Sequence, residues 1–139
     1  MYDPMMTAPM RDELTRVGVT SLESADAVDQ VLGNADQTTL VVVNSVCGCA
    51  AANARPGVSL AVQHGTQPDN VVTVFAGVDR EATERARSYL KGYMPSSPAI
   101  ALIKGGEVAF MLQRHEIEGR SPQEIASRLT GAFDEHCAG

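Results

Sequence analysis

Two cysteines separated by a single residue are the side chains in this sequence best suited to chemistry. Cys47, Gly48 and Cys49 follow a run of β-branched residues and precede an alanine-rich stretch. The run is typical of a buried strand and the alanines of a helix, so the cysteines are expected where a strand passes into a helix. Unpaired N–H groups and the helix dipole at such a point stabilise a thiolate and lower its pKa. The pattern therefore predicts thiol redox chemistry.

The two thiols are expected to have different roles. In thiol–disulfide exchange a thiolate attacks a sulfur, forms a mixed disulfide and is released by a second thiol. We expect Cys47, nearer the helix start, to be the nucleophile and Cys49 to be the resolving thiol, which gives a redox-active Cys47–Cys49 disulfide. Helix residues two apart point to different sides, so closing this disulfide is expected to need a distortion that Gly48 eases.

Composition limits the classes of function. The 139 residues, 44% hydrophobic and 20% charged, fit one soluble globular domain. A net charge of −6 without a basic cluster argues against nucleic-acid binding. No apolar stretch approaches the roughly 20 residues that a membrane span needs. Three cysteines and a start without signal-peptide character predict a reducing compartment, the cytoplasm.

The remaining chain predicts a single α/β domain over 1–139 with an N-terminal helical extension over 1–34. The pattern places the expected elements in this order: a loose segment 1–8, helices 9–17 and 25–32, strand 38–44, helix 47–63 kinked at Pro56, strand 71–76, helix 80–91, hairpin strands 99–103 and 107–112, and a final helix opened by the capping box Ser121–Glu124. The strand–helix–strand part is expected to form a parallel βαβ unit within a mixed sheet.

This order, with a dithiol where the first strand meets its helix, resembles the thioredoxin fold. Pro56 matches the proline that kinks the corresponding helix, and Pro98 matches the proline that lies opposite the dithiol after a cis bond. The stretch 103–108, Ile-Lys-Gly-Gly-Glu-Val, looks like the turn of the thioredoxin hairpin. The resemblance implies a thioredoxin-like fold.

More narrowly, four motifs resemble the bacilliredoxin family. They are the stretches 41–49 (VVVNSVCGC), 73–77 (TVFAG), 96–98 (SSP) and 114–119 (RHEIEG). The resemblance implies removal of bacillithiol from mixed disulfides on proteins, with a related disulfide-isomerase activity. The implied partners are proteins that carry mixed disulfides, a low-molecular-weight thiol such as bacillithiol as co-substrate, and a disulfide reductase.

The resemblance also suggests how a substrate is held. It implies that Gly48, Ser97 and Pro98 contact the substrate, with the backbone of Ser97 pairing with the bound chain. Thioredoxins hold a buried aspartate about six residues before the nucleophile, but this sequence has Val41 there. We expect Glu107, on the hairpin, to replace that aspartate as proton acceptor.

Other interpretations of the polar residues are weaker. A lone Cys-x-Cys lacks the second ligand pair that zinc prefers, and the three histidines have no ligand spacing, so neither a metal nor a bound cofactor is expected. Arg55 is expected to be a solvated helix arginine rather than a partner for an anionic thiol ligand. Cys137, near the chain end, is expected to have no role. Two further functions stay open: a protein disulfide isomerase, and a non-catalytic redox sensor or binding module modified at Cys47.

Overall fold

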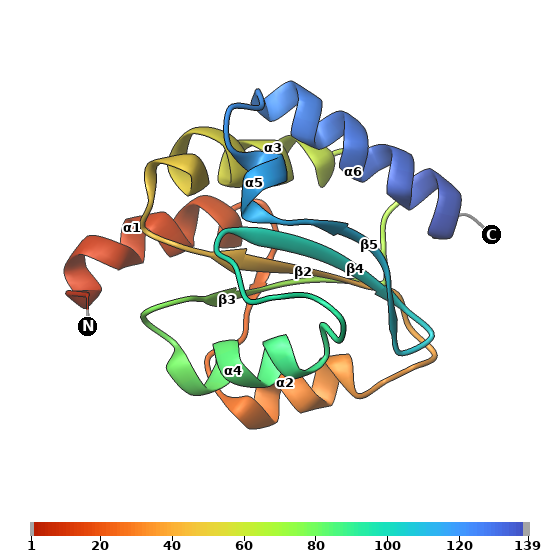
Figure 1. The fold of residues 1–139 in the computed structure, drawn as a ribbon, viewed down its shortest axis with the longest axis horizontal. Helices are drawn as coiled ribbons and strands as arrows, with labels where there is room; N and C mark the ends of the chain where they lie inside the picture. The colour runs from red at the N-terminus through yellow and green to blue at the C-terminus, as the bar shows by residue number, and fades with distance from the viewer. Residues whose placement is uncertain (1, 138–139) are drawn as a thin grey trace.

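A five-stranded sheet lies between two layers of helices in the structure, a computed structural model that describes residues 2–137 (Figure 1). The elements are α1 (Pro4–Thr15), β1 (Thr20–Ser21), α2 (Ala25–Leu32), β2 (Thr39–Asn44), the π-helical segment η1 (Ala50–Ala54), α3 (Arg55–Ala61), β3 (Asn70–Phe75), α4 (Arg80–Ser88), β4 (Ala99–Lys104), β5 (Glu107–Leu112), α5 (Arg114–Ile117) and α6 (Pro122–His136).

The strand order is β1-β3-β2-β4-β5. β1, β3 and β2 are parallel, whereas β4 is antiparallel to β2 and β5 is antiparallel to β4. The predicted βαβ unit and hairpin are thereby confirmed. β2 lies in the middle of the sheet and all six of its residues are buried, as its unbroken apolar run predicts.

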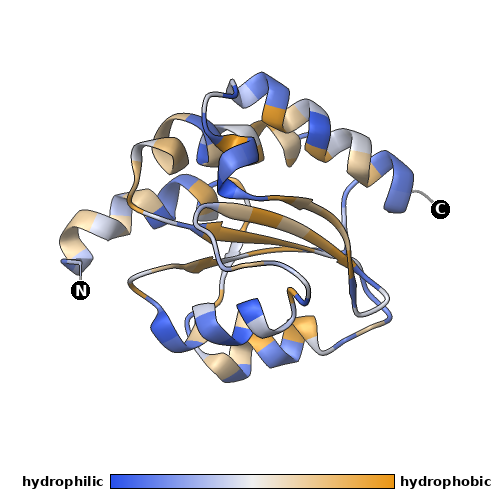
Figure 2. Ribbon diagram, in the orientation of Figure 1, coloured by the Kyte–Doolittle hydropathy of each residue, from blue (hydrophilic) through white to orange (hydrophobic). Residues whose placement is uncertain are grey.

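Each face of the sheet has its own core. Leu40 and Val42 pack toward α3 and α6, whereas Val41 and Val43 pack toward α2 and α4. Figure 2 shows the apolar residues concentrated in the sheet and on the inward sides of the helices. Because successive strand residues point to opposite faces, one short strand connects both cores. The end of β2 is therefore held in place from both sides.

The N-terminal region differs from its prediction. α1 begins at Pro4, with Asp3 as its N-cap, so the segment 1–8 is not a loose lead-in where the structure describes it. Between α1 and α2, β1 pairs with β3 and forms one edge of the sheet. The region 1–34 is therefore not a purely helical extension, because it supplies a strand. Two residues are too few to produce a strand periodicity in the sequence.

The helix after the cysteines begins with a wide π turn. The Arg55 N–H bonds to the carbonyl of Ala50, five residues earlier, and α3 then starts with Pro56 in its first turn. Proline has no N–H and its ring collides with the carbonyl four residues before it in a regular α-helix. Widening the turn places Pro56 near a helix start, where it is tolerated, instead of in the predicted helix interior.

The C-terminal half follows the sequence closely. β5 and the start of α6 have the predicted bounds, and Ser121 and Glu124 form the predicted capping box. α5 is an additional single turn that the sequence analysis does not predict. No helix within residues 2–137 combines the length and the apolar character that crossing a bilayer requires.

Candidate active site at the end of strand β2

The dithiol lies directly after β2. Cys47 precedes the first helical turn, and its carbonyl accepts the N–H groups of Ala50 at 3.1 Å and Ala51 at 3.2 Å. Cys49 lies within that turn, and the two sulfur atoms are 2.7 Å apart. The expectation that the thiols point to different sides is therefore wrong. It assumed that both residues are helical, whereas Cys47 is in the position of an N-cap.

Hydrogen bonds favour the thiolate of Cys47. Partial burial raises the pKa of this thiol, but hydrogen bonds from Cys49, from Ser45 and from the N–H groups of Ala50 and Cys49 outweigh it and lower the pKa below the usual value. The Ser45 hydroxyl donates to the Cys47 sulfur at 3.0 Å. Cys47 is therefore the more nucleophilic of the two thiols at neutral pH.

Cys49 has the opposite character. Burial raises its pKa first, followed by its hydrogen bond to Cys47 and repulsion from that thiolate. The guanidinium of Arg114 lowers the pKa of Cys49, but not enough to reverse the shift. A thiol that stays protonated beside a thiolate is suited to act second, once the negative charge on its neighbour is gone.

The pKa directions predict the order of alkylation. Iodoacetamide at pH 7 should label Cys47 first and Cys49 and Cys137 more slowly, because burial raises the pKa of Cys137 as well. The labelling rate of Cys47 should fall only when the pH drops through its lowered pKa. Fragment-ion mass spectrometry at several time points measures the three rates, and equal rates for the three cysteines would contradict the assignment.

The predicted substrate-binding residues lie on two segments. Gly48 is exposed between the cysteines, and a Cβ added to it would meet nothing within 4 Å. The Ser97–Pro98 bond is cis, as predicted. Arg114 connects this loop to the dithiol, since its Nη1 donates to the Ser97 carbonyl at 3.2 Å while its charge acts on both thiols.

Glu107 is not near the thiols. It pairs with Lys104 at the hairpin turn, and β4 runs antiparallel to β2, with Ile103 opposite Thr39. The turn therefore lies at the start of β2, whereas the dithiol follows its end. Glu107 is also exposed. The structure does not support it as the proton acceptor, and the buried Val41 offers no replacement.

The expectation that Arg55 is a solvated helix arginine is wrong. Its side chain is buried, with 2% of its surface exposed.

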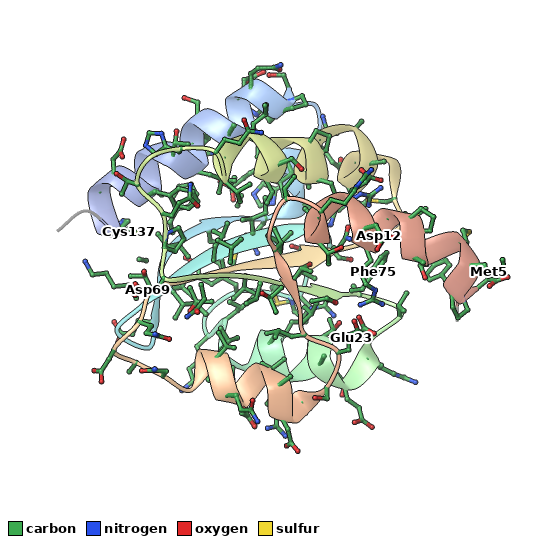
Figure 3. The ribbon with its side chains drawn as sticks, turned by 180° about the vertical axis from the view of Figure 1, so that it is seen from behind. Met5, Asp12, Glu23, Asp69, Phe75 and Cys137 are labelled. Carbon is green, nitrogen blue, oxygen red and sulfur yellow. The ribbon has the colours of Figure 1, made fainter. Side chains whose placement is uncertain are left out.

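Cys137 is remote from the dithiol. Figure 3 shows it beside Asp69 at one end of the molecule, with Phe75 toward the other end. Phe75 is opposite Asn44 in the sheet and so marks the dithiol end. In the described part of the chain, no three His, Cys, Asp or Glu side chains are grouped as metal ligands.

The sequence analysis gave no role to Asn44, Ser45 or Arg114, although all three lie in quoted motifs. One signal could have revealed the buried arginine. Between Asp36 and Asp69, Arg55 is the only Asp, Glu, Lys or Arg residue of the sequence, and it lies within an alanine-rich segment. A single charge in such a segment favours burial with a specific partner over a solvated helix face.

Comparison with known proteins identifies the family of this chain. A family model described as disulphide isomerase matches residues 2–137. A bacilliredoxin of Koribacter versatilis is 50% identical over 137 residues, which cover 99% of this chain and 94% of the relative. A bacilliredoxin of Bacillus licheniformis is also 50% identical, with 98% and 95% covered. The chain belongs to the bacilliredoxin family. With its dithiol, this membership makes it a thiol oxidoreductase, as predicted.

Solved structures confirm the thioredoxin fold. A solved protein described as having a thioredoxin fold superposes with a TM-score of 0.64 at 17% identity, covering 86% of this chain and 96% of the other. A thioredoxin of Malassezia sympodialis superposes with a TM-score of 0.60 at 19% identity, covering 87% and 92%. At such low identity these likenesses show the fold alone. The bacilliredoxin relatives carry the assignment to the family.

Proposed function

We propose that the protein removes bacillithiol from mixed disulfides on other proteins. The observation that carries this proposal is the pair of unlike thiols 2.7 Å apart, since hydrogen bonds lower the pKa of Cys47 whereas burial raises the pKa of Cys49. The bacilliredoxin name of the relatives supports bacillithiol as the small thiol. We also propose that the reaction takes place in the cytoplasm, where reducing conditions suit a transient catalytic disulfide.

The reaction is two successive exchanges. The Cys47 thiolate attacks the bacillithiol sulfur of a capped protein, so that a bond from Cys47 to bacillithiol forms and the protein thiolate leaves. The Cys49 thiol then loses its proton and attacks the Cys47 sulfur. Bacillithiol leaves as a thiol, and the Cys47–Cys49 disulfide remains. A disulfide reductase supplies the two electrons and two protons that restore the dithiol.

Gly48, Ser97 and Pro98 form the proposed contact surface for the capped protein. Gly48 adds no side chain between the thiols, so a bulky mixed disulfide can approach Cys47. Ser97 is half-buried and Pro98 is buried, which gives the loop beside the dithiol a fixed shape. Arg114, exposed and in contact with the Ser97 carbonyl, supplies a positive charge at this surface.

A mass-spectrometric assay tests the proposal. The wild-type protein should release bacillithiol from a capped client faster than buffer does, and a variant Cys47→Ser should not. The same client capped with 2-mercaptoethanol serves as the control for selectivity, and its 2-mercaptoethanol should be released more slowly than bacillithiol. Equal release with and without the protein would overturn the proposal.

A disulfide isomerase is the second candidate function, and the description of the matching family model supports it. It uses the same Cys47 thiolate, but the substrate is a disulfide within a protein. Reactivation of a scrambled disulfide protein without release of bacillithiol would select it. A redox sensor or binding module would instead remain capped at Cys47 and release nothing further.

A further inference from the structure

Arg55 is a buried charge below the active-site loop. A guanidinium taken out of water is destabilised unless it is paired and hydrogen-bonded, and a well-packed apolar side chain is often equally stable in its place. Arg55 is the only Lys or Arg among the buried residues of the described chain. Stability alone therefore gives little reason for an arginine here. The residues that accept hydrogen bonds from the guanidinium give a better one.

The guanidinium holds Asn44, the last residue of β2, and Ser45, which follows it. Nη1 donates to the Ser45 carbonyl at 2.8 Å and to the Asn44 side-chain oxygen at 3.0 Å. The same Asn44 oxygen accepts the Ser45 N–H at 2.9 Å. Both backbone polar groups of Ser45 are thus fixed within one buried network, so the residue has little freedom to rotate.

Ser45 in turn contacts the reactive sulfur. Its hydroxyl donates to the Cys47 sulfur at 3.0 Å and lies 3.3 Å from the Cys47 N–H, from which it accepts. A hydrogen bond to a thiolate depends on where the donor is held, because it weakens steeply as its angle departs from linearity. The guanidinium and the sulfur are therefore connected through one backbone residue.

The N-terminal helix supplies the balancing charge. Glu13 of α1 places a carboxylate oxygen 3.2 Å from Nε of Arg55, off the N–H direction, so the contact is an ion pair without a hydrogen bond. The Glu13 side chain is 37% exposed. Asn44 also donates to the Met10 carbonyl of α1 at 3.4 Å. α1 thus contacts the network at two points.

We propose that Arg55 is a positioning residue of the dithiol, which holds the Ser45 hydroxyl on the Cys47 sulfur, and that Glu13 neutralises its charge. The role concerns the reactivity of Cys47 and does not depend on which small thiol is the substrate. The other charged or titratable groups that act on Cys47 are Cys49 in the first turn and Arg114 near the cis bond, and Glu118 pairs with that arginine.

The test is a titration of the Cys47 thiolate by its absorbance at 240 nm, in a Cys49→Ser/Cys137→Ser background where no other cysteine absorbs. Arg55→Met should raise the midpoint by about one pH unit, the size of shift that loss of one hydrogen bond to a thiolate produces. Arg55→Lys, which keeps the charge, should shift it by less than half as much. Arg85→Met is the matched control, since this arginine pairs with Asp29 on the other side of the sheet.

A double variant distinguishes the positioning of the Ser45 hydroxyl from a direct effect of the Arg55 charge on the Cys47 thiolate. Ser45→Ala alone should raise the midpoint by a similar amount, and adding Arg55→Met should then raise it by only the few tenths of a pH unit that the guanidinium charge contributes directly. A second rise as large as the first would overturn the proposed action through Ser45. So would an unchanged midpoint in a folded Arg55→Met.

If circular dichroism shows that Arg55→Met is unfolded, the variants Arg55→Lys and Glu13→Gln test the proposal instead. Glu13→Gln should lower the midpoint by a few tenths of a pH unit, because the buried charge is no longer neutralised. An unchanged midpoint in both variants would overturn the proposal.

Discussion

Replacing Cys49 by serine should stop the reaction at the mixed disulfide on Cys47. Cys47 keeps its hydrogen bonds from Ser45 and the helix N–H groups, so the first attack still occurs. Without the neighbouring thiol 2.7 Å away, the captured small thiol can leave only by reaction with an external thiol. Intact-mass measurement should show one bound small thiol per chain, located at Cys47 by fragmentation.

The companion variant Cys47→Ser should be inactive at the level of the uncatalysed thiol reaction. A hydroxyl at this position is not a nucleophile for disulfides, and Cys49 stays protonated because burial raises its pKa. Cys137→Ser is the matched control and should keep wild-type rates, because that thiol is at the other end of the molecule. Capture at Cys49 in Cys47→Ser would reverse the assigned roles.

The largest loss of stability is expected from Phe133→Ala. Phe133 of α6 is fully buried in the core between the sheet and helices α3 and α6. Truncating a buried phenylalanine removes its burial free energy and leaves a cavity, together about 3–5 kcal/mol of the free energy of unfolding. A whole domain has only about 5–15 kcal/mol, so this one change should strongly destabilise the fold.

Urea denaturation measures this effect. The control is Leu60→Ala on α3, because that leucine is 42% exposed and its removal should change the free energy of unfolding by about 0.5 kcal/mol or less. Equal losses in the two variants would contradict the core assignment. Phe133→Leu, which retains more of the buried volume, should lose less than Phe133→Ala.

Local signals in the sequence were sufficient where one segment determines its own structure. The buried strand β2 followed from an almost unbroken β-branched run, and the start of α6 followed from Ser121, Pro122 and Glu124. Both predictions depend on neighbours along the chain. The cysteines could be placed between strand and helix for the same reason.

The predictions were wrong where residues distant in the sequence determine the local structure. The inward direction of Arg55 depends on the π turn before Pro56 and on acceptors at the end of β2, ten and eleven residues earlier. β1 exists because β3 offers it an edge, and its own two residues carry no strand pattern. The error about Glu107 has a different origin, because the predicted hairpin already determines where its turn lies relative to the dithiol. A strand that starts near the dithiol and runs antiparallel must carry its turn away from it.

The π turn of η1 also amounts to one extra residue within a helix, since its hydrogen bonds span five residues instead of four. Deleting Ala51, which is exposed, would allow a regular α-helix to form between the dithiol and α3. Five residues of the π turn cover about the same rotation as four residues of an α-helix, so the dithiol and α3 would keep nearly the same relative direction after the deletion. Pro56, however, would then lose the wide turn before it, and its ring would collide with the carbonyl four residues earlier. The extra residue of η1 therefore allows a proline to follow the dithiol within one continuous helical segment.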